Sequence, residues 1–284
     1  MAKPILGYPR HTAEAVFSSN NSFDSDYPVG NCGVFPFSKV ARTSDKTGIC
    51  VTAIFAEKKR IEVVTISRHN IIVSEATRRI KLYEDEAGEV LLHDSGVLDL
   101  WPATKTEAQV DFDGGQWWDR GYRAEEKANN PVHRPYFIEG LIYAKRVDVC
   151  LEAGAHVGDV DIGMIDISAA LVLPISPSVG ARYGFTTRSE MIEADGGVEY
   201  FERKNKPRVF EGELAAVATD DAKALLLDFQ RETDITEPFL WWLNREDELH
   251  TIRDCYMARN VRLGLMAYVT HHYHSVPINI KEIL

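Results

Sequence analysis

The run His271-His272-Tyr273-His274 has the side chains and spacing that could hold a metal ion. In a β-strand, His272 and His274 point to the same face, so their imidazoles could share a zinc ion. Such a site needs three or four ligands, and the sequence offers only Asp254 and Cys255 as unsupported further candidates. We therefore expect a polar strand near a surface or an interface, and we predict no metal and no cofactor.

A hydrolytic site would need an activated nucleophile or a pair of carboxylates. His69 with Asp94 or Asp99 could form part of a catalytic triad, but the chain has no G-x-S-x-G elbow and no glycine-rich oxyanion loop. A glycosidase would need two carboxylates that flank a sugar. An acidic segment surrounds Trp117 and Trp118, and its carboxylates are those of Asp111, Asp113, Asp119, Glu125 and Glu126. We interpret this segment as a solvated contact surface and predict that the protein is not an enzyme.

Two groups of residues are candidates for binding another molecule. Trp117 and Trp118 lie in an aperiodic excursion over about 101–135, and Arg68, His69 and Asn70 end an apolar run. Aromatic side chains on a long loop favour a protein contact or cover of a core edge over a sugar site. Both groups are predicted protein or glycan contacts.

Composition narrows the class of protein. The chain has 284 residues, 45% of them hydrophobic, and a formal net charge of −11, which is typical of a globular protein and disfavours nucleic acid as a partner. The N-terminus lacks the apolar segment of a signal peptide, and no apolar run is long enough to enter a membrane. Four cysteines are far apart and lie mostly in apolar runs, which predicts buried free thiols in a reducing cytoplasm: Cys32, Cys50, Cys150 and Cys255.

The first half of the chain has the pattern of an all-β domain. Ile49–Phe55 and Ile61–Ile66 are rich in β-branched residues and flank a charged break at 57–60, which predicts two neighbouring central strands covered on both faces. Alternating Thr77–Tyr83 and further short strands follow at close intervals. We expect this domain to span 1–175, with an insertion at about 101–135.

Paired prolines at Pro174 and Pro177 predict a domain boundary, and a second domain over 176–284. It should contain a tight turn at 195–197, strands at about 208–214, 255–259 and 261–270, and one helix over about 220–231. Apolar residues at helical spacing predict the buried face of that helix: Ala222, Leu225, Leu226 and Phe229. Trp241 and Trp242 follow each other in a strand, so we expect one in the core and the other either in a subunit contact or covering the second face of the barrel.

The N-terminal half contains the segments PVGN, SKVARTS, ICVTAIFAEKKRIEVVTISRHN and RRIKLY. This pattern resembles the galactose-binding-like jelly rolls of structural proteins from tailed phages. The strand pair that completes such a domain resembles the later segment RVDVCLEAGAHVGDVDIGMIDI. The second half contains GFTTRSEMIEADGG, RVFEGELAAVATDDAKALLLDF and EPFLWWLN. These segments are similar to the β-barrel-plus-helix domain of siphophage distal tail and tail-hub proteins. The resemblance implies an all-β fold, a jelly-roll β-sandwich followed by a small β-barrel or sandwich with one packed α-helix.

The same resemblance implies a structural subunit of a phage tail tip. Such a protein is made in the cytoplasm of the host bacterium and resides in the virion, in a ring of its own copies, six by resemblance. The ring would connect the tail tube to the baseplate or host-recognition apparatus, with the hub, the tape measure and the fibres as further partners. The alternative is a carbohydrate-binding module that recognises a host surface glycan.

Overall fold

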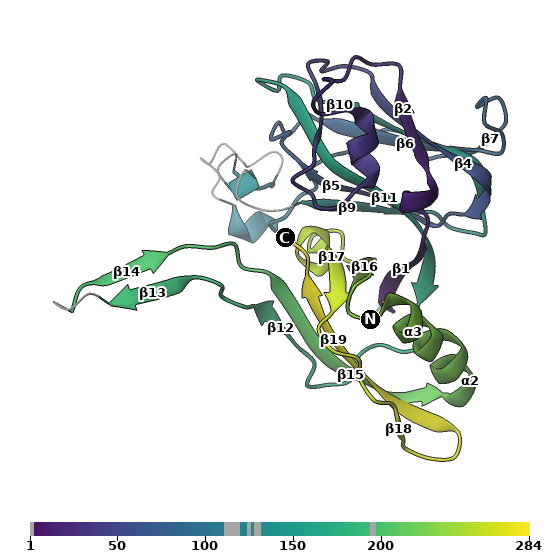
Figure 1. Ribbon diagram of the computed structural model, residues 1–284, viewed down its shortest axis with the longest axis vertical. Helices are drawn as coiled ribbons and strands as arrows, with labels where there is room; N and C mark the ends of the chain where they lie inside the picture. Colours follow the sequence, from purple (N-terminus) through teal and green to yellow (C-terminus); the bar gives the residue numbers. More distant parts are fainter. Residues whose placement is uncertain (1–2, 111–119, 124–125, 128–131, 194–196) are drawn as a thin grey trace. The chain divides into compact units, whose positions relative to one another are not determined.

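The computed structural model describes residues 3–110, 120–123, 126–127, 132–193 and 197–284. The chain forms two compact units (Figure 1). The sandwich unit contains Gly7–Leu171 and Asn244–Cys255, and the arm unit contains Met1–Leu6, Val172–Leu243 and Tyr256–Leu284. The units are therefore not the two consecutive stretches 1–175 and 176–284, because the segment 244–255 belongs to the sandwich unit.

The sandwich unit consists of two antiparallel sheets with a shared core, as the jelly-roll expectation requires (Figure 1). One sheet has the order β2 (Val16–Ser19), β4 (Ile49–Arg60), β10 (Tyr143–Glu152), β6 (Thr77–Tyr83) and β7 (Leu91–Asp94), with β8 (Leu98–Asp99) also beside β6. The other has the order β11 (Val160–Val172), β5 (Val63–His69) and β9 (His133–Phe137), with β3 (Ala41–Thr43) also beside β11. The strand β1 (Ile5–Arg10) begins in the arm unit and ends in this one.

The predicted pairing of the two apolar runs is wrong. Ile49–Phe55 and Ile61–Ile66 lie in opposite sheets, because the charged residues 57–60 extend β4 and the chain crosses over at Ile61 and Glu62. In β4, buried residues alternate with half-buried ones, as in a strand with one face on a core. In β5 the first five residues are all buried, as predicted for a strand covered on both faces.

The cysteine prediction is half right. Cys32 and Cys255 are buried free thiols, and burial raises the pKa of Cys32 to about 12. Cys50 and Cys150 instead form a disulfide. Antiparallel pairing of β4 with β10 places these two residues directly opposite each other. The sequence alone does not show this pairing, because 100 positions separate the two residues.

The arm unit is built on a sheet with the order β12 (Arg182–Phe185), β15 (Arg208–Ala218), β19 (Tyr273–Glu282), β17 (Cys255–Asn260) and β16 (Phe239–Trp242), in which β12, β15, β19 and β17 pair antiparallel. The predicted strand at 261–270 is reduced to β18 (Ala267–Tyr268), which pairs with β19. A separate two-stranded sheet, β13 (Glu190–Glu193) with β14 (Glu199–Glu202), extends from β12 and β15 (Figure 1). We call this hairpin the arm.

The predicted helix is confirmed as one helical segment over 219–233, made of α2 (Thr219–Asp221), a π-helical stretch (Ala222–Leu227) and α3 (Asp228–Thr233). Ala222, Leu226 and Phe229 are buried, and Phe229 packs edge-on against Phe239 at 4.9 Å between ring centroids. Leu225 is exposed, contrary to the predicted face. The wider π turn shifts the phase of the side chains, and this moves Leu225 off the buried side.

The remaining short elements are 3₁₀ turns at Thr12–Glu14, Val29–Gly33 and Glu107–Gln109, and α4 at Thr251–Asp254. Among the described residues, no helix is long and apolar enough to cross a membrane. The all-β class with one helical segment packed on a sheet is therefore confirmed.

Candidate functional surfaces

The predicted contact group Arg68, His69 and Asn70 does not form one exposed surface. The ring nitrogens of His69 are buried, and its ring lies edge-on to Trp101 at 5.5 Å between centroids. Burial lowers the pKa of His69 to about 3, so its imidazole is neutral at neutral pH. The Arg68 guanidinium lies 4.9 Å from the centroid of the Phe37 ring. Of the three residues, Asn70 is exposed, whereas Arg68 and His69 are half-buried.

Asp94, one of the two acids considered for a catalytic triad with His69, is paired with another residue. Arg79 donates two hydrogen bonds to the Asp94 carboxylate, and this holds the pKa of Asp94 well below its ordinary value. The imidazole of His69 instead faces Trp101. Asp94 is thus committed to an ion pair with Arg79 on β6.

The histidine cluster does not gather ligands either. His274 is buried on β19, with its ring 4.3 Å from that of Tyr268, whereas His272 is exposed in the turn before the strand. In the part of the chain that the structure describes, no three metal-ligating side chains come together.

The structure tests the predicted contact role of only one of the two tryptophan pairs. Trp117 and Trp118 lie outside the described residues. Trp241 and Trp242 are 1% and 5% exposed, and the ring of Trp241 packs on Phe210 at 4.9 Å. Both rings are therefore core, and the subunit contact predicted for one of them needs a different residue.

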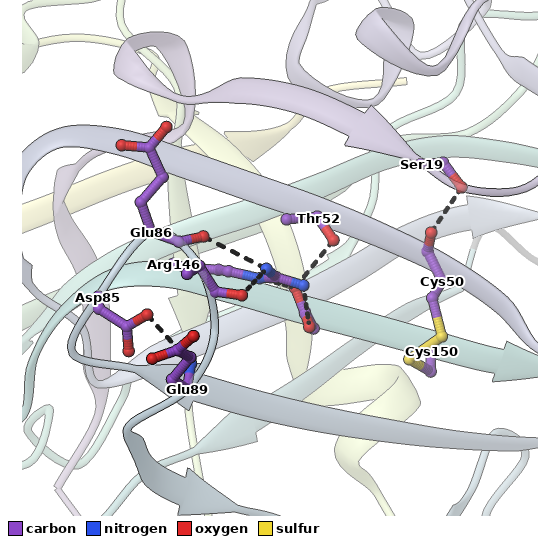
Figure 2. Close-up of polar contacts among 10 residues, drawn as sticks. Ser19, Cys50, Thr52, Asp85, Glu86, Glu89, Arg146 and Cys150 are labelled. Carbon is purple, nitrogen blue, oxygen red and sulfur yellow. Dashed lines mark hydrogen bonds and ion pairs between the residues drawn. A yellow bond between two sulfur atoms is a disulfide. The ribbon is translucent and has the colours of Figure 1, made fainter.

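The outer face of β4, β10 and β6 carries a polar cluster whose charges are paired (Figure 2). Arg146 donates to both carboxylate oxygens of Asp148 at 2.8 and 2.9 Å, and to the carbonyl oxygens of Glu86 and Ala87 at 3.3 and 2.8 Å. Thr52 donates to Asp148 at 2.9 Å. Arg146 and Asp148 are therefore paired with each other, and the Arg146 guanidinium also ties the 84–90 turn to the sheet.

A second polar cluster was not found by sequence reasoning. Arg42 donates to both oxygens of the Asp161 carboxylate at 2.6 and 2.9 Å, and its guanidinium lies 4.5 Å from the centroid of the Tyr27 ring. Asn70 accepts a hydrogen bond from the Asp161 amide at 2.9 Å and donates one to the Asp159 carbonyl at 2.8 Å. Tyr27 is 37% exposed. An exposed aromatic ring is thus combined with a guanidinium, a carboxylate and an amide. We call it the Tyr27 cluster.

The arm presents apolar side chains to solvent. All eight residues of β13 and β14 are exposed. The four large apolar side chains among them are 56–64% exposed: Met191, Ile192, Tyr200 and Phe201. An isolated two-stranded hairpin is only marginally stable in water, and exposed apolar groups of this size mark interaction sites.

Comparisons with known proteins identify no relative by sequence: neither a protein-family model nor a curated protein matches. Solved structures do match. The family 32 carbohydrate-binding module of NanJ from C. perfringens, in complex with galactose, is 10% identical with a TM-score of 0.37, over 58% of this chain and 98% of that one. The lectin domain of lectinolysin, complexed with Lewis B antigen, is 10% identical with a TM-score of 0.35, over 57% of this chain and 97% of that one. SpGH29 is 9% identical with a TM-score of 0.37, over 58% of this chain but only 29% of its own.

Proposed function

We propose that this protein is a non-catalytic structural subunit that assembles with copies of itself and with other proteins. In finer detail, the resemblance in sequence pattern suggests a virion component at the tail tip of a bacteriophage. The observation that carries the proposal is the arm, whose apolar side chains have no core to enter within their own unit. Burying apolar surface is the main driving force of protein association, so these side chains favour a protein partner.

The test is the association state of the purified full chain. Sedimentation velocity should show concentration-dependent self-association. A variant with Met191, Ile192, Tyr200 and Phe201 all changed to Ser should stay monomeric, with an unchanged circular dichroism spectrum. The control is Val97→Ser on the sandwich unit, an apolar residue that is 68% exposed, and it should associate as the wild type does. A wild-type chain that remains monomeric would contradict the proposal.

The second candidate function is binding of a surface glycan at the Tyr27 cluster. A sugar offers hydroxyl groups and an apolar ring face, and the cluster provides both complementary types of group: the Tyr27 ring, and the amide, carboxylate and guanidinium of Asn70, Asp161 and Arg42. Trp117 and Trp118 lie outside the described residues, so the glycan contact predicted for them stays a separate prediction.

Calorimetry of the full chain against fragments of bacterial cell-wall and surface glycans tests this second function. We expect Tyr27→Ala and Asn70→Ala to abolish any heat of binding, and Tyr143→Ala, an exposed tyrosine elsewhere on the sandwich unit, to retain it. If no glycan binds to the wild type, the glycan function is rejected, and the assembly proposal stands on its separate test.

A further inference from the structure

The two faces of the arm differ in how their charges are balanced. Antiparallel pairing places Glu190 opposite Glu202 on the face that also carries Ile192 and Tyr200. Lys204 bridges this glutamate pair and offsets its repulsion, with its Nζ 2.6 Å from Glu190 and 3.4 Å from Glu202. The same contact lowers the pKa of Glu190 and raises that of Lys204.

The opposite face has no such cation. Glu193 stands directly across from Glu199, next to the apolar pair Met191 and Phe201. Among the described residues, no lysine or arginine forms an ion pair with either glutamate. Like charges directly opposite each other destabilise a two-stranded sheet. This face of the arm therefore carries two neighbouring carboxylates and two apolar side chains, and its negative charge is not offset by a cation of the described residues.

The base of the arm has the opposite character. A cleft of about 760 Å³ is lined there by Arg188, Glu190, Arg203, Lys204, Asn205 and Leu284. Lys204 is engaged by the glutamates of its own arm. Arg188 and Arg203 are exposed, and within the described ranges neither has an acidic partner.

The glutamate pair at the outer end of the arm and the two arginines at its base cannot form ion pairs with each other within one arm. Glu193 is five residues from Arg188, and Glu199 is four from Arg203. At about 3.3 Å per residue in an extended strand, these separations are roughly 13–17 Å, far beyond ion-pair distance. A second copy of the chain can bring an arginine pair to the glutamate pair.

We propose that the outer end of the arm, through Glu193, Glu199, Met191 and Phe201, docks into the Arg188–Arg203 cleft at the base of the arm in a second copy of this chain. This inference rests on the proposed assembly function and names its contact. Two carboxylates meet two guanidiniums, and the adjacent apolar pair leaves water at the same time. Because each copy carries both halves, the contact can repeat from one copy to the next, as a ring requires.

Charge reversal with complementation tests the contact. In the full chain, Glu193→Lys with Glu199→Lys should weaken self-association about tenfold or more, and so should Arg188→Glu with Arg203→Glu. Each reversed variant should self-associate more weakly than the wild type, but the two should associate when mixed, because the unchanged glutamates of one variant meet the unchanged arginines of the other. Sedimentation velocity at low salt is the measurement, and high salt should weaken the wild-type contact.

The matched control is Glu89→Lys with Glu237→Lys, which changes the net charge as much at two exposed sites outside the arm. This control should associate as the wild type does. Association that survives both arm reversals but is lost in the four-serine arm variant would overturn the docking contact and leave the assembly function standing. A wild type that never associates would overturn both. Failure of the reversed variants to associate when mixed would also overturn the docking contact.

Discussion

The outer face of the β4–β10–β6 sheet and the arm are both exposed β-surfaces, but opposite charges are paired on the first and like charges face each other on the second. On the sandwich, Arg146 forms an ion pair with Asp148 and Arg79 forms one with Asp94 (Figure 2 shows Arg146 among its polar contacts). On the arm, Glu193 faces Glu199, and apolar rings are exposed beside them. A surface whose polar groups are satisfied can remain in water, whereas the arm gains by acquiring a partner. This difference is the reason why we assign the proposed protein contact to the arm and not to the sandwich face.

The largest expected effect is a difference in stability between the same substitution, Ile→Ala, made in the core and on the arm. Ile80→Ala removes a fully buried side chain from β6 and should lower the free energy of unfolding by about 2–5 kcal/mol. Ile192→Ala on the arm should change it by less than about 0.5 kcal/mol, because that side chain is already in water. Urea denaturation of both variants provides the measurement. Equal losses would show that the arm is part of the folded core.

The disulfide comes next in size. Replacing Cys50 and Cys150 with Ala should lower the free energy of unfolding by about 2–4 kcal/mol, because the bond closes a long loop in the unfolded chain. Thermal unfolding with and without a thiol reductant is the check. Reductant should lower the melting temperature of the wild type but leave that of the double variant unchanged. Insensitivity of the wild type would mean that the bond does not form.

The all-β class and the helix could be predicted from sequence because they depend on local signals. The β-branched runs Ile49–Phe55 and Ile61–Ile66 predicted strands, and Ala222, Leu226 and Phe229 predicted a helix face. Which sheet each strand joins could not be predicted, because it depends on where the chain turns. The charged residues after Phe55 resemble a loop, yet they form the exposed end of β4.

The candidate surfaces were harder to predict than the fold. Arg42 and Asp161 are 119 positions apart, so no sequence spacing indicates the Tyr27 cluster. The tight turn predicted at 195–197 indicated a hairpin in this region, but no sequence signal predicted how its two faces are covered. Both faces are exposed, because no second layer of the arm unit covers them. Solvent exposure is a property of the tertiary arrangement, which local patterns do not record.

A third prediction concerns the paired charges of the sandwich face. Arg146→Gln removes two hydrogen bonds from the nearly buried Asp148 carboxylate and should lower the free energy of unfolding by about 1–3 kcal/mol. Arg188→Gln on the arm unit should be within about 0.5 kcal/mol of the wild type, because Arg188 is exposed. Chemical denaturation compares the two. A costly Arg188 substitution would place that arginine in a network of its own chain.

The Arg79–Asp94 pair predicts a pH dependence. Arg79 lowers the pKa of Asp94 in the folded protein, so the ionised carboxylate stabilises the fold. That contribution is fully present above the unfolded pKa of about 3.9 and declines as the pH falls below it. The melting temperature of Asp94→Asn should therefore lie below that of the wild type at pH 7, and the gap should narrow in acid. A gap that stays constant down to low pH would exclude the ion pair as its cause.

The smallest effect is the most specific to the arm. Glu199→Gln removes the repulsion from Glu193 and should slow amide hydrogen exchange in β13 of the dilute chain by up to about fivefold. Glu202→Gln is the matched control on the other face: its carboxylate is already balanced by Lys204, so exchange should be unchanged or faster. If both substitutions slow exchange equally, the general acidity of the arm is the cause. If only Glu199→Gln does so, the acidic face carries an energetic cost in the monomer that a cationic partner would remove.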